Sequence, residues 1–306
     1  MFMVICGPTA SGKSAAAVET AALLNGEIIS ADSMQVYRGM DIGTNKISEE
    51  SKKNITHHLI DIADPKDGYS AAMFKKDAEA AMDEIKKRNR LPIICGGTGL
   101  YIDAIIKGLA AAGETNESVK EQVRLMEKEK GADYLYGLLK EKDPQEAAVI
   151  DRKNPRRLIR ALEIIESTGR KVSDIKKETA ATAYDDSCVI FVINAPREAL
   201  YRRIDRRVDE MVKAGLFEEV ESLLKKGVKA DSVPMQAIGY KEAAGFLNGG
   251  EKKEEAIARI KQATRNYAKR QLTWFKRYKD AVWIDSDEDN SQKTAGDIIK
   301  AWKSRH

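Results

Sequence analysis

The sequence feature that most constrains the fold is a glycine-rich turn between a predicted strand and a predicted helix. Residues Phe2–Cys6 form a short apolar run that is typical of a strand buried on both faces. An alanine-rich segment that ends at Asn25-Gly26 predicts the helix. Between them stands Gly7-Pro8-Thr9-Ala10-Ser11-Gly12-Lys13-Ser14, which fits G-x-x-x-x-G-K-[ST]. This order of elements predicts a P-loop.

The predicted P-loop implies a site for phosphate groups. Its glycines would let backbone N–H groups surround phosphate oxygens, beside the partial positive charge of the helix N-terminus. Lys13 would supply a point charge, and Ser14 would ligate a Mg²⁺ ion that bridges phosphates. A chance glycine-rich turn is the alternative, which the flanking strand and helix disfavour. The motif leaves the reaction open, because kinases, nucleoside triphosphatases and other transferases share it.

Strands and helices alternate along the chain. Strands are predicted at 27–30, 91–95, 188–193 and 282–284, and long helices at 197–224, 251–279 and 294–303. After a loop through His57 and His58, another helix begins at Ser70, with Phe74, Ala78, Ala81 and Ile85 on one face. This alternation predicts an α/β fold, a parallel sheet of the P-loop (nucleoside-triphosphate-hydrolase-like) type with flanking helices. Residues 110–187 are helical and charged, so we predict an inserted helical domain there, between core segments 1–109 and 188–306.

The composition excludes disordered and fibrous proteins, because 42% of the residues are hydrophobic and only 33% are charged. A net charge of +4 permits an anionic partner without requiring one. Cys6, Cys95 and Cys188 lack the close spacing of a zinc site and predict buried thiols in a reducing compartment. Since neither a membrane span nor a signal-peptide pattern is present, the expected location is the cytoplasm, with no membrane partner.

Asp32 is a candidate general base because it follows the second predicted strand. Ligands of open α/β sheets bind outside the carboxyl ends of the strands, so this carboxylate is expected to face the phosphate site. An aspartate that caps a turn or helix is the alternative, and spacing alone leaves both open.

Seven segments identify a family by resemblance. Residues 31–46 read ADSMQVYRGMDIGTNK, followed by HHLID at 57–61, YS at 69–70, GGTGLY at 96–101, NPRR at 154–157, QAIGY at 236–240 and YAKRQ at 267–271. Together they resemble the signature of the tRNA dimethylallyltransferases, also called tRNA isopentenyltransferases, over nearly the whole chain. The resemblance implies transfer of a dimethylallyl group from dimethylallyl diphosphate to N6 of the adenine just 3′ of the anticodon, with release of diphosphate.

The resemblance also implies roles for residues at matching positions. Asp32 resembles the general base that takes the proton from N6, and Gln35 resembles a residue that reads the edge of a flipped adenine. Thr98 matches a position beside the adenine and the bridging oxygen. Arg203 or Arg207 resembles the diphosphate-binding arginine, a choice that the resemblance leaves open.

The resemblance implies a site with catalytic residues, a diphosphate site and tRNA contacts. Its catalytic residues are Asp32, Thr9, Lys13, Thr98, Arg203 and Arg207. Its diphosphate or nucleotide site is Gly7, Pro8, Thr9, Ala10, Ser11, Gly12, Lys13 and Ser14, with Ser14 as the ligand of Mg²⁺. Its tRNA contacts are Asp32, Ser33, Met34, Gln35, Thr98, Arg156, Arg157, Leu158, Ile159, Arg160, Gln236, Gly239, Tyr240 and Lys241. The expected partners are dimethylallyl diphosphate and a tRNA anticodon stem-loop, and the expected state is a monomer whose inserted domain binds tRNA.

Such a reaction has clear physical needs. An exocyclic adenine amine is a weak nucleophile, so transfer needs a placed base, a stabilised leaving diphosphate and close alignment of donor and acceptor. The adenine must also leave its stack, at a cost of a few kcal/mol.

Basic segments could bind the RNA. Residues 256–279 contain eight Lys or Arg residues and no Asp or Glu, interleaved with Tyr267, Trp274, Phe275 and Tyr278. The alternative is a helix whose aromatic residues pack on the core while its cations are solvated. Asn154 is expected to cap a helix with Pro155 at its first position, where the nearby arginines oppose the helix dipole and so favour an anionic partner. In the cluster Arg202, Arg203, Arg206 and Arg207, some members would pair with Asp205, Asp209 or Glu210.

Two other functions remain open. A P-loop kinase for nucleotides or small molecules would share the P-loop, Asp32 and the arginines, and it would transfer phosphate from ATP. A non-catalytic RNA-binding protein could retain the P-loop as a scaffold, although intact Lys13, Ser14 and Asp32 disfavour this. His57 and His58 are interpreted as structural, because neighbouring side chains of a strand point to opposite faces and no ligand cluster accompanies them.

Overall fold

The computed structural model describes residues 1–108, 116–181, 187–250, 252–286 and 290–305, and the chain divides into two units. The first unit comprises Met1–Ile106 and Asp185–His306, and the second comprises Lys107–Tyr184. The start that we predicted for the inserted domain, at residue 110, and for the helix at 251 both lie outside the described residues. No helix among the described residues is long and apolar enough to cross a membrane.

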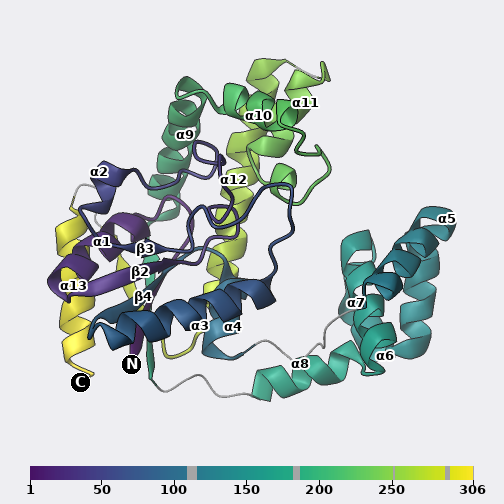
Figure 1. The fold of residues 1–306 in the computed structure, drawn as a ribbon, viewed down its shortest axis with the longest axis horizontal. Coiled ribbons are helices and arrows are strands. Elements are labelled where there is room, and N and C mark those ends of the chain that lie inside the picture. The colour runs from purple at the N-terminus through teal and green to yellow at the C-terminus, as the bar shows by residue number, and fades with distance from the viewer. Residues whose placement is uncertain (109–115, 182–186, 251, 287–289, 306) are drawn as a thin grey trace. The chain divides into compact units, whose positions relative to one another are not determined.

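The described part of the first unit contains a six-stranded parallel sheet (Figure 1). Its strands are β1 (Phe2–Cys6), β2 (Gly26–Ser30), β3 (His57–His58), β4 (Leu91–Gly96), β5 (Cys188–Asn194) and β6 (Val282–Asp285), in the order β3-β2-β4-β1-β5-β6. The predicted α/β fold is therefore confirmed. The loop predicted through His57 and His58 is wrong at these two residues, which pair with Ile28 and Ile29 as an edge strand too short to leave a sequence pattern.

Helices cover both faces of the sheet. The described helices of the first unit, some of which pack on the sheet, are α1 (Lys13–Leu23), α2 (Glu49–Lys52), α3 (Ala71–Lys87), α4 (Gly99–Ile106), α9 (Arg197–Lys213), α10 (Leu216–Lys225), α11 (Tyr240–Leu247), α12 (Lys253–Phe275) and α13 (Ser291–Lys303). Met3, Ile5 and Phe191 join α1 and α13 in one core cluster on one face. Because side chains alternate along a strand, Phe2 and Val4 point to the opposite face, where α3 contacts β2 and β4. The inner strands β1, β2 and β4 are thus buried on both faces, as the apolar run Phe2–Cys6 predicts for β1, whereas the edge strands β3 and β6 are partly exposed.

Several predicted details are wrong. The single helix predicted over 197–224 is two helices, because Gly215 has φ 103° and turns the chain between α9 and α10. The buried face of α3 contains Met82 in place of Ala81. Cys188 is half-buried at the start of β5, whereas Cys6 and Cys95 are buried.

The second unit is helical throughout its described residues. It contains α5 (Glu117–Lys142), α6 (Pro144–Val149), α7 (Pro155–Thr168) and α8 (Val172–Ala181), and Gly131 interrupts α5 with φ 80°. Its core packs Leu135, Leu139 and Leu158 against neighbouring helices. The buried Asp143 accepts hydrogen bonds from the backbone N–H groups of Glu146 (3.1 Å) and Ser173 (2.8 Å), which joins α6 to α8.

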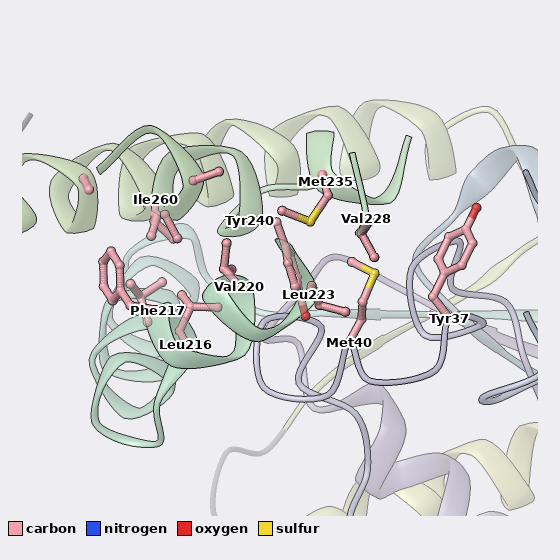
Figure 2. Close-up of a cluster of buried hydrophobic side chains, with 14 of the residues drawn as sticks. Tyr37, Met40, Leu216, Phe217, Val220, Leu223, Val228, Met235, Tyr240 and Ile260 are labelled. Carbon is pink, nitrogen blue, oxygen red and sulfur yellow. The ribbon is translucent and has the colours of Figure 1, made fainter. Parts of the chain in front are cut away.

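A second core cluster of the first unit holds the segment after β2 against the helices α9 to α12. Figure 2 shows Met40 among Leu223, Val228 and Met235. Tyr240 is fully buried in the same cluster. Residues that follow Asp32 are therefore fixed by apolar packing to helices that lie far away in the sequence.

A buried carboxylate ties the start of β2 to its neighbours. Glu27 is 1% exposed and accepts hydrogen bonds from Arg88 Nε (3.0 Å), Arg88 Nη2 (2.8 Å) and Arg90 Nη1 (3.2 Å), while His58 Nε2 lies 2.6 Å away. The bonds from Arg88 and the contact with His58 lower the pKa of Glu27 to about 2, against the cost of burial.

Glu27→Gln is expected to lower the free energy of unfolding at pH 7 by about 3 kcal/mol, because the charged partners lose their carboxylate. The contribution of Glu27 is present above its unfolded pKa and is lost as the pH falls from about 4.5 to about 2. Denaturant unfolding at pH 7 and pH 3 would measure it, with Glu84→Gln in the exposed Glu84–Lys87 pair of α3 as control. Equal losses of stability at both pH values would contradict the assignment.

Candidate functional site

A cavity of about 460 Å³ opens where β1, β2 and β4 end. The P-loop lines one part of it through Thr9, Lys13 and Ser14, and Asp32 and Gln35 line another. Apolar contacts come from Ile28, Ile47 and Ile60, and Arg207 of α9 completes the wall. The structure thus brings the phosphate cradle and the predicted base into one cavity within the first unit.

The P-loop has the shape that a phosphate cradle requires. Gly12 has φ 85° and directly precedes α1, and a Cβ atom on Gly7 would lie 2.4 Å from the carbonyl oxygen of Ile193. Lys13 Nζ donates to the carbonyl of Pro8 at 3.3 Å, so the ammonium group lies against the P-loop backbone. Burial lowers the pKa of Lys13, and the charge of Arg207 lowers it further, whereas the charge of Asp32 raises it. An anion in the cradle would meet a partly desolvated cation.

Asp32 closes its own turn and also lines the cavity. Its Oδ1 accepts hydrogen bonds from the N–H groups of Met34 (2.9 Å) and Gln35 (3.4 Å), which is the turn-forming role that we kept as the alternative. Oδ2 takes no hydrogen bond within the described residues, and the side chain borders the cavity. The turn-forming interpretation is therefore confirmed for Oδ1, and the role of general base stays a prediction.

Thr98 and Gln35, which the resemblance associates with the adenine, both bond residues near Asp32 in the sequence. Thr98 Oγ1 accepts from the N–H of Ser33 at 3.1 Å, although Thr98 does not line the cavity. Gln35 Nε2 donates to the carbonyl of Thr44 at 3.2 Å, and Gln35 Oε1 accepts from Ser30 Oγ at 3.3 Å. Both ends of the Gln35 amide are thus held by hydrogen bonds within the protein, at the wall of the cavity.

The structure separates the two candidate arginines. Arg207 Nη1 donates to Thr9 Oγ1 at 3.3 Å and borders the cavity, and burial lowers its pKa. Arg203 Nη1 donates to Ser286 Oγ at 2.9 Å and does not line this cavity, but it lines a neighbouring pocket that Arg207 and Gly12 of the P-loop also line. The exposed Arg206 lies 3.8 Å from Glu210, as i,i+4 pairing predicts.

Sequence reasoning missed the residues that hold the segment after Asp32. Glu219 of α10 accepts hydrogen bonds from the N–H groups of Asp41 and Ile42 (both 2.8 Å) and Gly43 (3.1 Å), and from the hydroxyl of Tyr240 (2.6 Å). A Cβ atom on Gly43 would lie 2.4 Å from the Tyr240 ring, so the loop requires glycine there. No local pattern marks Glu219, because the three backbone N–H groups that it binds lie more than 170 residues away.

One face of α12 explains the glycines that follow β4. Gln271 and Trp274 lie against Gly97 and Gly99, where added Cβ atoms would be 2.2 Å and 2.3 Å from the two side chains. A Cβ atom on Gly96 would lie 2.1 Å from the carbonyl oxygen of Ala31. Tyr267, one turn before Gln271, has a pKa raised to about 12 by burial and by the charge of Asp32, with an opposing hydrogen bond from Thr98. This helix face therefore borders the site.

The basic segment 256–279 contains no Asp or Glu, but carboxylates of another helix pair with two of its cations. Arg265 pairs with Asp205 and Lys261 with Asp209, both of α9, at 2.6 Å. Phe275 and Tyr278 are buried in the core, as the alternative predicts. A shallow groove lined by Lys269, Arg270, Thr273, Trp274 and Arg277 keeps the combination of cations and an aromatic ring at the surface.

The remaining predicted tRNA contacts are divided between surface and core. In α7, Arg156, Arg157 and Arg160 are exposed and Ile159 is half-buried, but Leu158 is fully buried. Asn154 precedes α7 as predicted, with no hydrogen bond from its side chain to the helix. Near α11, Lys241 is exposed and Gln236 is half-buried, whereas Gly239 and Tyr240 are buried.

The histidines are placed by hydrogen bonds. His58 contacts Glu27, and His57 Nδ1 lies 2.8 Å from the carbonyl of Ile55 while its side chain borders the cavity. Within the residues that the structure describes, no cluster of three His, Cys, Asp or Glu side chains could hold a metal ion.

Comparisons with known proteins identify a family. The pattern that defines the IPP transferase family matches residues 35–278. A relative from Thermoanaerobacter sp. (strain X514), called tRNA dimethylallyltransferase, is 46% identical over 98% of this chain and 96% of its own length. Another of that name, from Caldanaerobacter subterraneus subsp. tengcongensis, is 45% identical over 94% of this chain and 92% of its own length.

Solved structures agree as well. The chain is similar to a tRNA delta(2)-isopentenylpyrophosphate transferase from Staphylococcus epidermidis, with TM-score 0.71 and 39% identity over 100% of this chain and 99% of that one. A eukaryotic dimethylallyltransferase acting on tRNA gives TM-score 0.84 at 29% identity, over 97% of this chain and 77% of that one.

Proposed function

The chain belongs to the IPP transferase family, and on that basis we propose that it transfers a dimethylallyl group from dimethylallyl diphosphate to N6 of the adenine just 3′ of the anticodon in tRNA. Relatives that match nearly its full length are named tRNA dimethylallyltransferases, and they support an enzyme that modifies tRNA. The products would be N6-(dimethylallyl)adenosine and diphosphate.

The observation that carries the proposal is the single cavity that joins a P-loop to Asp32 and Gln35. The cradle fits the diphosphate, and Ile28, Ile47 and Ile60 offer an apolar wall to a branched hydrocarbon tail. The Oδ2 atom of Asp32 would take the proton that N6 loses as the new C–N bond forms. Lys13 and Arg207 would stabilise the charge on the departing diphosphate, and Thr98 would hold Ser33 beside the base.

A Mg²⁺ ion fits the site only as a partner of the diphosphate. The hydroxyl of Ser14 borders the cavity, and the described residues offer no set of three protein ligands, which suits an ion held largely by phosphate oxygens and water. When bound, the ion would neutralise part of the charge on the leaving group.

The substrate partner is a tRNA anticodon stem-loop. The exposed arginines of α7 and Lys241 are proposed as phosphate contacts, so that the helical second unit, together with residues near α11, would bind the RNA. Nucleotide binding at the cradle, a monomeric state and a cytoplasmic location remain predictions.

The test is a single-turnover reaction with radiolabelled dimethylallyl diphosphate and an anticodon stem-loop. Label should enter the RNA and should be lost when the target adenine is replaced. A parallel reaction with γ-labelled ATP tests the kinase. Phosphate transfer without prenyl transfer would establish the kinase, and the absence of both reactions would favour an RNA-binding scaffold.

Arg207→Ala is expected to lower kcat/KM for the prenyl donor by about 100-fold, because a partly buried cation beside Thr9 is lost from the leaving group. Arg203→Ala should cost much less, since Arg203 bonds Ser286 outside the cavity. Steady-state donor kinetics and inhibition by diphosphate would measure both. The reverse ranking would assign the diphosphate to Arg203.

A further inference from the structure

Gln271 of α12 joins two segments of the site through both ends of its side-chain amide. Its Oε1 accepts a hydrogen bond from the N–H of Thr9 at 2.8 Å, and its Nε2 donates to the carbonyl of Gly97 at 2.9 Å. The side chain is only 5% exposed, so water cannot easily replace either bond. A single buried side chain thus links the loops that follow β1 and β4.

These two loops serve different partners of the proposed reaction. Thr9 belongs to the diphosphate cradle, and its hydroxyl accepts from Arg207. Gly97 precedes Thr98, whose backbone N–H donates to the carbonyl of Ala31 at 3.1 Å and whose hydroxyl holds the N–H of Ser33. Asp32 lies between Ala31 and Ser33 in the sequence. The chain of contacts therefore runs from the donor side, through Gln271, to the base.

The packing around Gln271 leaves little freedom. A Cβ atom on Gly97 would lie 2.2 Å from Gln271 Nε2, so only glycine permits this approach. Ala268, one turn earlier on α12, is fully buried against Ala10 of the P-loop in a small cluster with Leu200 and Ile204. The helix is consequently fixed against the loop, and the amide is held at one position.

We propose that Gln271 is a positioning residue that sets the donor cradle at a fixed distance from the acceptor segment. This inference rests on the proposed function. Transfer between a bound donor and a bound acceptor requires the reacting atoms at about 3–3.5 Å, and a displacement of about 1 Å costs roughly 100-fold in rate. Gln271 itself touches neither reactant and acts through Thr9 and Gly97.

The first variant is Gln271→Met, which keeps the length of the side chain and removes both hydrogen bonds. At saturating donor and RNA its single-turnover rate should fall by about 100-fold, while its affinity for the anticodon stem-loop stays close to that of the wild-type chain. Gln262→Met is the matched control, because Gln262 lies exposed on the same helix and bonds only Asn266 among the described residues. It should leave rate and affinity unchanged.

The second variant, Gln271→Glu, adds a pH readout that a purely structural role would not give. The ionised carboxylate can accept from Thr9 but faces the carbonyl of Gly97, whereas the protonated acid can donate to that carbonyl. Burial raises the pKa of such a carboxyl group. The ratio of the variant's rate to the wild-type rate should therefore rise as the pH falls from about 8 to about 6, at a temperature where both chains stay folded.

The outcomes separate this inference from the function on which it rests. If the wild-type chain transfers no label to RNA, the proposed function fails and the role of Gln271 falls with it. If the wild-type chain is active and Gln271→Met reaches the wild-type rate at saturation, only the positioning role is overturned. A rate ratio for Gln271→Glu that stays constant with pH, with loss confined to thermal stability, would likewise reduce Gln271 to a structural residue.

Discussion

Asp32→Asn is expected to lower the single-turnover rate of prenyl transfer by about 1,000-fold, with little change in the affinity for RNA. Asparagine keeps an Oδ1 atom that can accept from the N–H groups of Met34 and Gln35, so the turn should survive. What it loses is the carboxylate on a side chain that lines the cavity. The change thus separates the observed turn bonds of Asp32 from its proposed role as base.

The measurement compares the rate at saturating donor and RNA with stem-loop binding by filter retention. Asp67→Asn, at an exposed aspartate in the turn before α3, serves as control. Asp32→Ala should be at least as slow and should also be less stable, because the turn loses its acceptor. Weakened RNA binding with a normal rate at saturation would contradict the role of base.

Local patterns predicted most elements, because the helices have an amphipathic period and the buried strands are short apolar runs. The P-loop is recognisable because its strand, turn and helix are contiguous. The break between α9 and α10 was missed because the amphipathic pattern continues across Gly215, and only the conformation of that residue turns the chain. Two residues of β3 carry too little pattern to be recognised.

The sequence predicted the P-loop and Asp32 at the cavity from motifs, but it did not predict the tertiary contacts that hold them. Glu219 and Gln271 bond partners more than 170 residues away, and no spacing rule connects them. The helical period places Arg203 and Arg207 on one face, but only the fold shows which of them reaches Thr9. The ion pairs of the basic segment in α12 could not be predicted either, because their carboxylates belong to α9, which is distant in the sequence.

Lys13→Met is expected to lower kcat/KM for the prenyl donor by about 1,000-fold. The half-buried ammonium lies in the cradle 3.3 Å from the carbonyl of Pro8, close enough to Arg207 for their charges to interact. Desolvation strengthens its attraction for a diphosphate, because fewer water molecules screen the two charges. Lys13→Arg should not restore the rate, since a planar guanidinium differs from an ammonium in size and in hydrogen-bond geometry.

Donor kinetics and calorimetry with inorganic diphosphate would measure the loss, and Lys87→Met, at an exposed lysine of α3, provides the control. RNA affinity without donor should stay unchanged, because Lys13 lines the cradle and is not among the phosphate contacts proposed in α7 and at Lys241. Diphosphate affinity should fall together with kcat/KM, since one cation serves both the bound donor and the leaving group. Wild-type diphosphate binding by Lys13→Met would remove the cradle from the mechanism and, with it, the reason that Asp32 and Arg207 share a cavity with the P-loop.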